Sequence, residues 1–195
     1  GLTSDKYLIV VNETCTPGVV PPVTISPKAE KEKILAELIA LKASLVNVNA
    51  KNVRERGENE RKNNDKKILT RVIADLRTSL RANLWVTDTR LNDRKGDKVF
   101  DAEQEAVIDL KVLYNTNKSA VSKTVVLDFI TRLAADDRAI AVAAIADAVA
   151  ASGVPANIAN ANVALASGDA ATALGHYVTA IGHYQDAWGF AVTSF

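Results

Sequence analysis

The sequence predicts a mainly α protein with an N-terminal extended arm (1–26), a long antiparallel helical hairpin (27–98) and an Ala-rich C-terminal helical bundle (99–195). Three observations support this fold class. From about Pro27 onward, apolar residues recur at the three- and four-residue spacing of amphipathic helices. One N-terminal segment, Tyr7–Ile25, instead has the composition of strands. The apolar fraction of 48% and the charged fraction of 24% are typical of an ordinary folded protein.

The arm divides into a strand and an apolar strap. The strand, Tyr7–Val11, is a continuous and mostly β-branched run, and turn-forming residues around Cys15 follow it. Two prolines confine the strap, Val19–Ile25, to a sheet edge or a polyproline-like path. A lone strand cannot satisfy its own backbone, so the protein's helices or another copy must cover it. We expect intersubunit contact through the apolar residues of the arm, which are Tyr7, Leu8, Ile9, Val10, Val11, Val19, Val20, Val23 and Ile25.

The hairpin begins with a helix start signal at Ser26-Pro27, in which Ser is the N-cap and Pro the first helical residue. Apolar residues then follow at a 4-3-4-3 spacing, at Ile34, Leu38, Leu41, Leu45 and Val48. Residues 49–64 are polar and form either an exposed helical extension or a flexible turn; we favour a break near 57–64. A second helix of similar length is predicted at about 65–91, which favours antiparallel packing of the two.

The bundle is predicted to contain four helices. The first begins at Asp101 and the second near Ser119, and the second carries the longest apolar pattern in the chain. That pattern pauses at Asp136-Asp137, which is either a new N-cap or an exposed turn of one long helix. A third helix lies between Pro155 and Gly168, and Asp169 caps the last one.

Small and aromatic residues at the C-terminal end follow a recognisable spacing. Gly168-Asp169, Ala173, Tyr177, Ala180 and Ile181 stand at +0, +1, +5, +9, +12 and +13. Over about 155–182 this pattern resembles the turn and second helix of a tetratricopeptide repeat. The resemblance implies a helical hairpin in which small and aromatic residues interlock. We predict packing or interface anchors on the last helix at Tyr177, Ile181, Tyr184 and Trp188.

The sequence offers no constellation for catalysis. His176 and His183 share a helix face, but they lie about 10 Å apart along it, too far for one metal ion. No phosphate-cradling glycine loop, nucleophile elbow or zinc spacing occurs. We therefore predict no catalytic residue, no metal, no cofactor and no enzymatic activity. Residues 51–98 carry a net charge of +6, but interleaved acidic residues favour a solvated helix face over binding of nucleic acid.

These observations favour assembly. The basic region at 51–98 contrasts with a net charge of −5 over the rest of the chain, which suits head-to-tail packing of copies. We expect a self-assembling structural protein, a filament, sheath or shell subunit whose partners are other copies of itself. The alternative is a monomeric helical adaptor that presents a groove to a partner protein. The chain begins at Gly1 and contains no Met, which favours a mature secreted or cell-surface protein, and no run is long enough to span a membrane.

Overall fold

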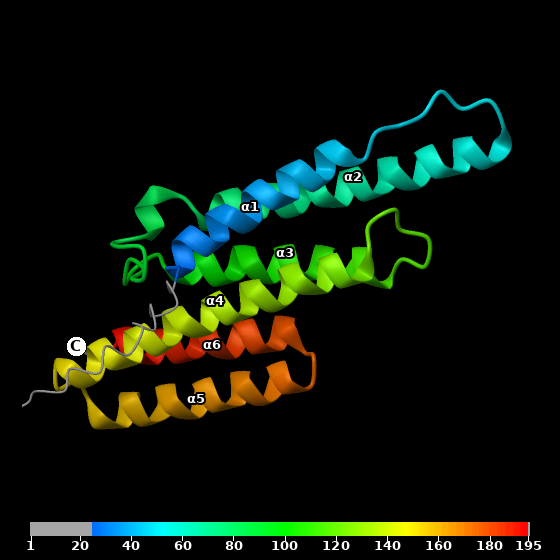
Figure 1. The fold of residues 1–195 in the computed structure, drawn as a ribbon. Coiled ribbons are helices and arrows are strands. Elements are labelled where there is room, and N and C mark those ends of the chain that lie inside the picture. Colours follow the sequence, from blue (N-terminus) through cyan, green and yellow to red (C-terminus); the bar gives the residue numbers. More distant parts are fainter. Residues whose placement is uncertain (1–24, 195) are drawn as a thin grey trace, which may run out of the picture.

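The computed structural model describes residues 25–194, and the predicted mainly α fold is confirmed there (Figure 1). No strand occurs in this part of the chain, where an isolated antiparallel bridge joins Trp85 to Leu91. A single 3₁₀ turn spans Ala82–Leu84. The six α-helices of this range are α1 (Pro27–Ser44), α2 (Val53–Ser79), α3 (Asp97–Asn115), α4 (Lys123–Ala150), α5 (Pro155–Ala173) and α6 (Tyr177–Val192).

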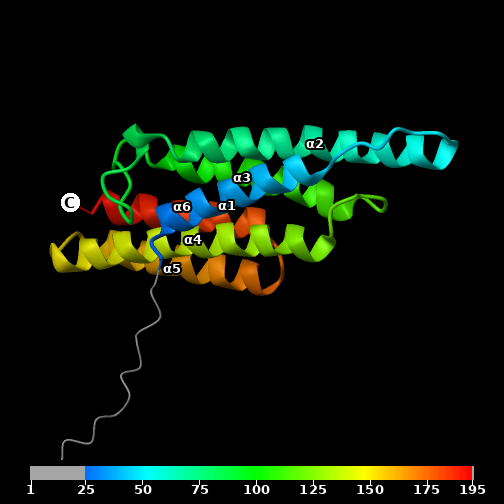
Figure 2. The same cartoon turned by 45° about the horizontal axis from the view of Figure 1, so that its top comes forward.

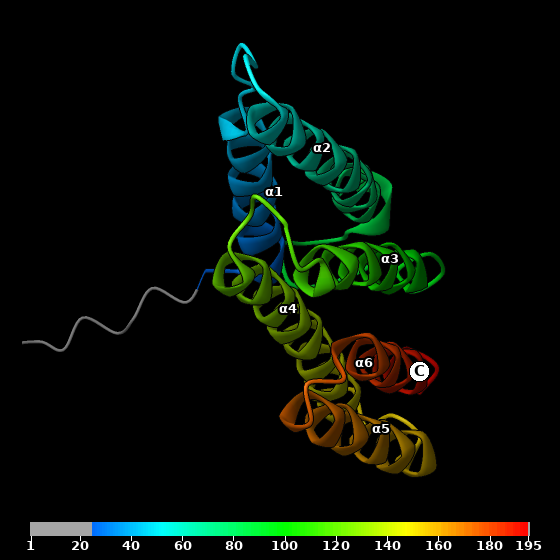
Figure 3. The same cartoon turned by 90° about the vertical axis from the view of Figure 1, so that its right-hand side faces the viewer.

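The helices form two adjacent rows, which are clearest when they are viewed end-on (Figure 3). One row contains α1, α4 and α5, and the other contains α2, α3 and α6. Consecutive helices pack against each other, and α4 also packs against α1 and α6. The position of α4 at the centre of its row therefore places it in contact with four other helices.

In the hairpin of α1 and α2, the second helix begins earlier in the chain than the sequence suggested. Asn52 caps α2 by accepting a 3.0 Å hydrogen bond from the backbone N–H of Glu55, so the helix begins at Val53. The predicted break near 57–64 is wrong, because Gly57 lies inside α2. The chain reverses at 45–52 instead, where the Asn59 side chain bonds both the N–H and the carbonyl of Val48. Figure 2 shows this end of the hairpin projecting past the other helices.

The far end of α2 also differs from the prediction. The helix ends at Ser79 rather than near residue 91, and the chain continues through a loop whose apolar residues fold inward. Leu84, Trp85 and Leu91 are buried, and the indole N–H of Trp85 donates to the carbonyl of Ser79 over 2.8 Å. These apolar residues resemble a helix face in sequence, but tertiary packing uses them to close the end of the bundle.

The turn predicted at Gly168-Asp169 is wrong, since α5 continues through it. The reversal lies seven residues later, at Gly175, whose φ of +73° suits glycine. Gly168 instead allows close helix packing: a Cβ atom there would lie 2.3 Å from Cε1 of Tyr184. The tetratricopeptide-like spacing therefore reflects small and aromatic packing between α5 and α6, with the turn in a different register.

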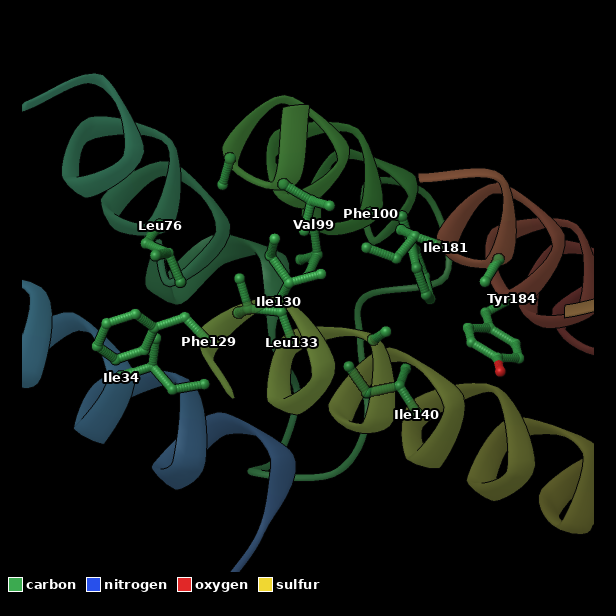
Figure 4. Close-up of a cluster of buried hydrophobic side chains, with 14 of the residues drawn as sticks. Ile34, Leu76, Val99, Phe100, Phe129, Ile130, Leu133, Ile140, Ile181 and Tyr184 are labelled. Atoms are coloured by element: carbon green, nitrogen blue, oxygen red, sulfur yellow. The ribbon is translucent and has the colours of Figure 1, made fainter. Parts of the chain in front are cut away.

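The core of residues 25–194 runs through all six helices (Figure 4). Ile130 and Leu133 of α4 point toward Val99 of α3, while Phe129 lies beside Ile34 of α1. All five side chains are at most 4% exposed. The chain thus buries aliphatic and aromatic side chains along both rows, and α4 links them.

Candidate functional site

The predicted arm contacts lie almost entirely outside the described residues. Tyr7–Val11, Val19, Val20 and Val23 belong to that part of the chain, as does Cys15. Ile25 is described; it precedes α1 and is 47% exposed. The expectation that these residues contact another copy stays a prediction.

The predicted anchors of α6 lie in or beside the core. Ile181, Tyr184 and Trp188 are buried, and Tyr177 is half-buried. The Tyr184 hydroxyl donates a 3.0 Å hydrogen bond to Asp169. The ring of Trp188 packs at a tilt against Phe100 of α3, with ring centroids 5.9 Å apart. These side chains join α6 to α5 and α3.

The two histidines occupy different positions. His176 stands exposed just before α6, and His183 is half-buried within it. Among residues 25–194, no group of three or more His, Cys, Asp or Glu side chains is placed to hold a metal ion. No helix in that range is both long and apolar enough to cross a membrane.

The outward faces of α4 and α5 are unusually apolar. On each helix, exposed alanines and valines recur every three or four residues, which places them along one side. We call these two stripes the Ala/Val faces. Their members are Ala135, Ala139, Val142, Ala146 and Val149 on α4, and Ala156, Ala159, Val163, Ala166, Ala170 and Ala173 on α5.

Few charges accompany the Ala/Val faces. Residues 139–195 contain three charged side chains, all aspartates. One of them, Asp169, receives two hydrogen bonds from Arg138, at 2.7 and 2.9 Å, so that α5 is tied to α4. This ion pair lowers the pKa of Asp169. The charge nearest the Ala/Val faces is therefore compensated within the chain.

A second unusual feature lies inside the bundle: three charged side chains meet where α1, α3 and α4 come together. Lys31 Nζ donates to Glu103 Oε2 over 2.5 Å and to Asp137 Oδ1 over 2.8 Å. All three side chains are 0% exposed. We call this group the buried triad. Charged side chains are rarely buried completely, and then only when paired, so the triad is a candidate for a specific role.

The triad has fewer hydrogen-bond partners than its atoms require. Glu103 Oε1 and Asp137 Oδ2 are buried and lack a partner, as does Oδ2 of the adjacent Asp136. Burial raises the pKa of Asp137 well above its usual range, and Glu103 raises it further. The pKa of Asp136 is raised to about 7, chiefly by burial. Both aspartates therefore favour a bound proton in the folded chain.

Two opposing effects act on the pKa of Lys31. Burial alone would lower its pKa, but the charges of Asp137 and Glu103 outweigh burial, so the pKa of Lys31 is raised. Nearby, Arg132 binds Glu30 at 2.7 Å and Glu37 at 2.6 Å, which pairs the next layer of charges between α1 and α4. Two of the three helices of the triad, α1 and α4, are thus joined by a further set of ionic contacts.

The sequence analysis missed the triad. Of the two interpretations of Asp136-Asp137, the new N-cap is wrong because α4 is continuous; one long helix is correct, but Asp137 is buried rather than exposed. A signal was present: Lys31 and Asp137 each stand at an apolar position of their helix, three residues before Ile34 and Ile140. Glu103 likewise stands three residues before Ala106. Spacing marks each as inward-facing, but it does not show that three helices bring them together.

Comparison with known proteins adds no relative: no family model, curated protein or solved structure matches this chain.

Proposed function

We propose that this chain is a structural protein that assembles with other copies of itself, as a secreted or cell-surface filament, sheath or shell subunit linked through its N-terminal arm. The observation that most supports this proposal is the pair of exposed Ala/Val faces. Val163 is 68% exposed and Val149 57% exposed. The charges that adjoin these faces, Arg138 and Asp169, are paired with each other. A second copy could cover these faces without leaving a charge unpaired.

The size of the Ala/Val faces explains why an arm would be needed as well. Helix α5 has 19 residues and so is about 28 Å long. Two neighbouring helices are about 20 Å wide, which gives roughly 550 Å² for each partner. Stable interfaces bury about 800 Å² for each partner. The apolar arm residues, such as Val19 and Val20, would supply the remaining area.

The alternative is a monomeric helical adaptor. It is supported by a shallow groove between α3 and α6, whose lining includes the exposed side chains of Ile108 and Val112 together with Val178. An amphipathic helix from another protein could place its apolar side chains there. In this case the arm would fold back on its own chain and copies would not associate.

Light scattering after size-exclusion chromatography separates the two functions. The full chain should show a molar mass that rises with concentration, and removal of residues 1–26 should abolish the rise. Ala166→Glu should weaken assembly because it places a charge on the Ala/Val face of α5. Ala74→Glu is the matched control, since Ala74 is an exposed alanine on the charged surface of α2. A full chain that is monomeric at every concentration would overturn the proposal.

A further inference from the structure

We propose that the buried triad is a site of self-modification, in which Lys31 and Asp137 join through an amide bond and Glu103 relays the protons. The product is an isopeptide cross-link between the side chains of α1 and α4. The inference rests on the placement of an amine, a carboxyl acceptor and a second carboxyl group within one buried cluster. It is independent of the proposed assembly.

The geometry places the reacting atoms in contact. Lys31 Nζ lies 2.8 Å from Oδ1 of Asp137, so the nitrogen is already beside the carboxyl carbon that it would attack. Glu103 accepts a hydrogen bond from the same nitrogen over 2.5 Å, so both carboxyl groups meet at Lys31 Nζ. Glu103 therefore touches the nucleophile, as a proton acceptor must, and its buried Oε1, which like Asp137 Oδ2 has no partner, is available to pass the proton on.

The protonation state of Asp137 suits the reaction, whereas the raised pKa of Lys31 opposes it until a proton passes to Glu103. A carboxylate repels a nucleophile, so the acceptor must be a neutral carboxylic acid, and the raised pKa of Asp137 favours that form. Lys31 must in turn lose a proton, and the hydrogen bond to Glu103 gives that proton a path that avoids water. Burial favours the transfer, because an amine and a carboxylic acid cost less to bury than two ions.

The reaction needs no co-reactant. Lys31 gives one proton to Glu103, and its lone pair attacks Cγ of Asp137 to form the C–N bond. The nitrogen then gives up a second proton, which Glu103 relays to the hydroxyl group of Asp137. The C–O bond breaks and water leaves with that bonding electron pair. Of the three protons on the ammonium, one stays on the amide, one leaves in the water and one remains on Glu103.

The exclusion of water protects the product. All three side chains are 0% exposed, so hydrolysis would require the cluster to open. The bond would close a loop of 106 residues and tie the first turns of α1, which directly follow the arm, to the centre of the bundle. A cross-link of that span restricts the unfolded chain and resists separation of the two helices.

Intact mass spectrometry of the denatured full chain tests the proposal. We expect a mass lower than that of the sequence by one water molecule. Proteolysis should then yield a branched peptide that joins the segment containing Lys31 to the segment containing Asp137. An unmodified mass, a water loss without that branched peptide, or a Lys31–Glu103 linkage would each overturn the proposed bond.

Variants test the relay. Glu103→Gln keeps the shape of the side chain but cannot accept and return the proton, so this variant should have the full mass of its sequence. Glu105→Gln is the matched control, since Glu105 is exposed on the same helix, and it should lose one water like the parent chain. Circular dichroism verifies that both variants fold. A folded Glu103→Gln chain that still forms the bond would overturn the role of Glu103.

Discussion

The hairpin of α1 and α2 and the hairpin of α5 and α6 show two different ways of building the same motif. Residues 27–79 contain 21 charged side chains, whereas residues 155–192 contain two. Both helices of the first hairpin begin with a side-chain N-cap, at Ser26 and Asn52, and many of their charged side chains are exposed. The second hairpin depends on small residues that allow helices to approach closely, and it leaves alanines and valines exposed. A charged surface keeps copies apart, whereas an uncharged one allows them to associate.

The charges of the first hairpin are not all on its surface: at the buried triad, a charged side chain of α1 lies within the apolar core. Replacing Lys31 by Met should be the most damaging single change, because it leaves the carboxyl groups of Glu103 and Asp137 buried without the nitrogen that both of them contact. We expect a loss of about 3–5 kcal/mol in the free energy of unfolding, measured by urea denaturation. Lys33→Met is the control, since Lys33 is exposed on the same helix and should change stability by less than about 0.5 kcal/mol. Similar values for the two variants would contradict a structural role for the triad.

Substitution of one glycine in each hairpin tests whether the helices pack closely there. Gly168→Ala in α5 should destabilise by about 1–3 kcal/mol, because the added Cβ would meet the ring of Tyr184. Gly57→Ala in α2 should instead stabilise by about 0.5–1 kcal/mol, since no atom lies within 4 Å and alanine is the better helix former.

Thermal or urea unfolding of both glycine variants gives the sign of each change. Loss of stability in both would show that α2 is packed more closely at Gly57 than the structure indicates. A gain in both would mean that the contact between α5 and α6 can relax around Tyr184.

The pH dependence of stability reports on the protons held around the triad. The pKa of Asp136 is about 7 in the folded chain and near 4 when unfolded, so folding takes up a proton between these values. The Asp136 contribution to stability is complete below about pH 4 and is lost as the pH rises to about 7. Its slope is at most about 1.4 kcal/mol for each pH unit.

The variant Asp136→Asn isolates this contribution. Unfolding measured by urea from pH 4 to pH 8 should show a shallower decline with rising pH for the variant than for the parent chain. Taking the difference between the two chains removes the contributions of other carboxyl groups, such as Asp169, whose lowered pKa acts in the opposite direction. Parallel curves would show that Asp136 holds no proton.

Sequence periodicity predicted the fold class and most of the core, because helices bury residues at a regular spacing. It placed the start of α2 and the end of α5 wrongly, because tertiary contacts determine them. The Asn59 side chain bonds the 45–52 loop before α2, and Gly168 packs against Tyr184 within α5. The buried triad was not predicted, for a related reason. Within a single helix, a charged residue at an apolar position is only a departure from the periodic pattern. The carboxyl groups that pair with Lys31 come from two other helices, so the pattern of one helix cannot predict them.

The smallest expected effects come from two exposed ion pairs with the same geometry. Arg71 binds Asp109 through two hydrogen bonds of 2.7 Å, linking α2 to α3, and Arg138 binds Asp169 in the same way between α4 and α5. Exposed pairs contribute about 0–1 kcal/mol. Asp169 also accepts from Tyr184, so that Arg138→Ala disturbs a network of three side chains whereas Arg71→Ala breaks an isolated pair.

Double-mutant cycles measure both couplings, with Asp109→Ala and Asp169→Ala as the second changes. The coupling of Arg138 to Asp169 should be larger by a few tenths of a kcal/mol, because Tyr184 holds the carboxylate in place before the arginine binds it. High salt should reduce both couplings. Equal couplings would show that the hydroxyl of Tyr184 adds nothing to the pair.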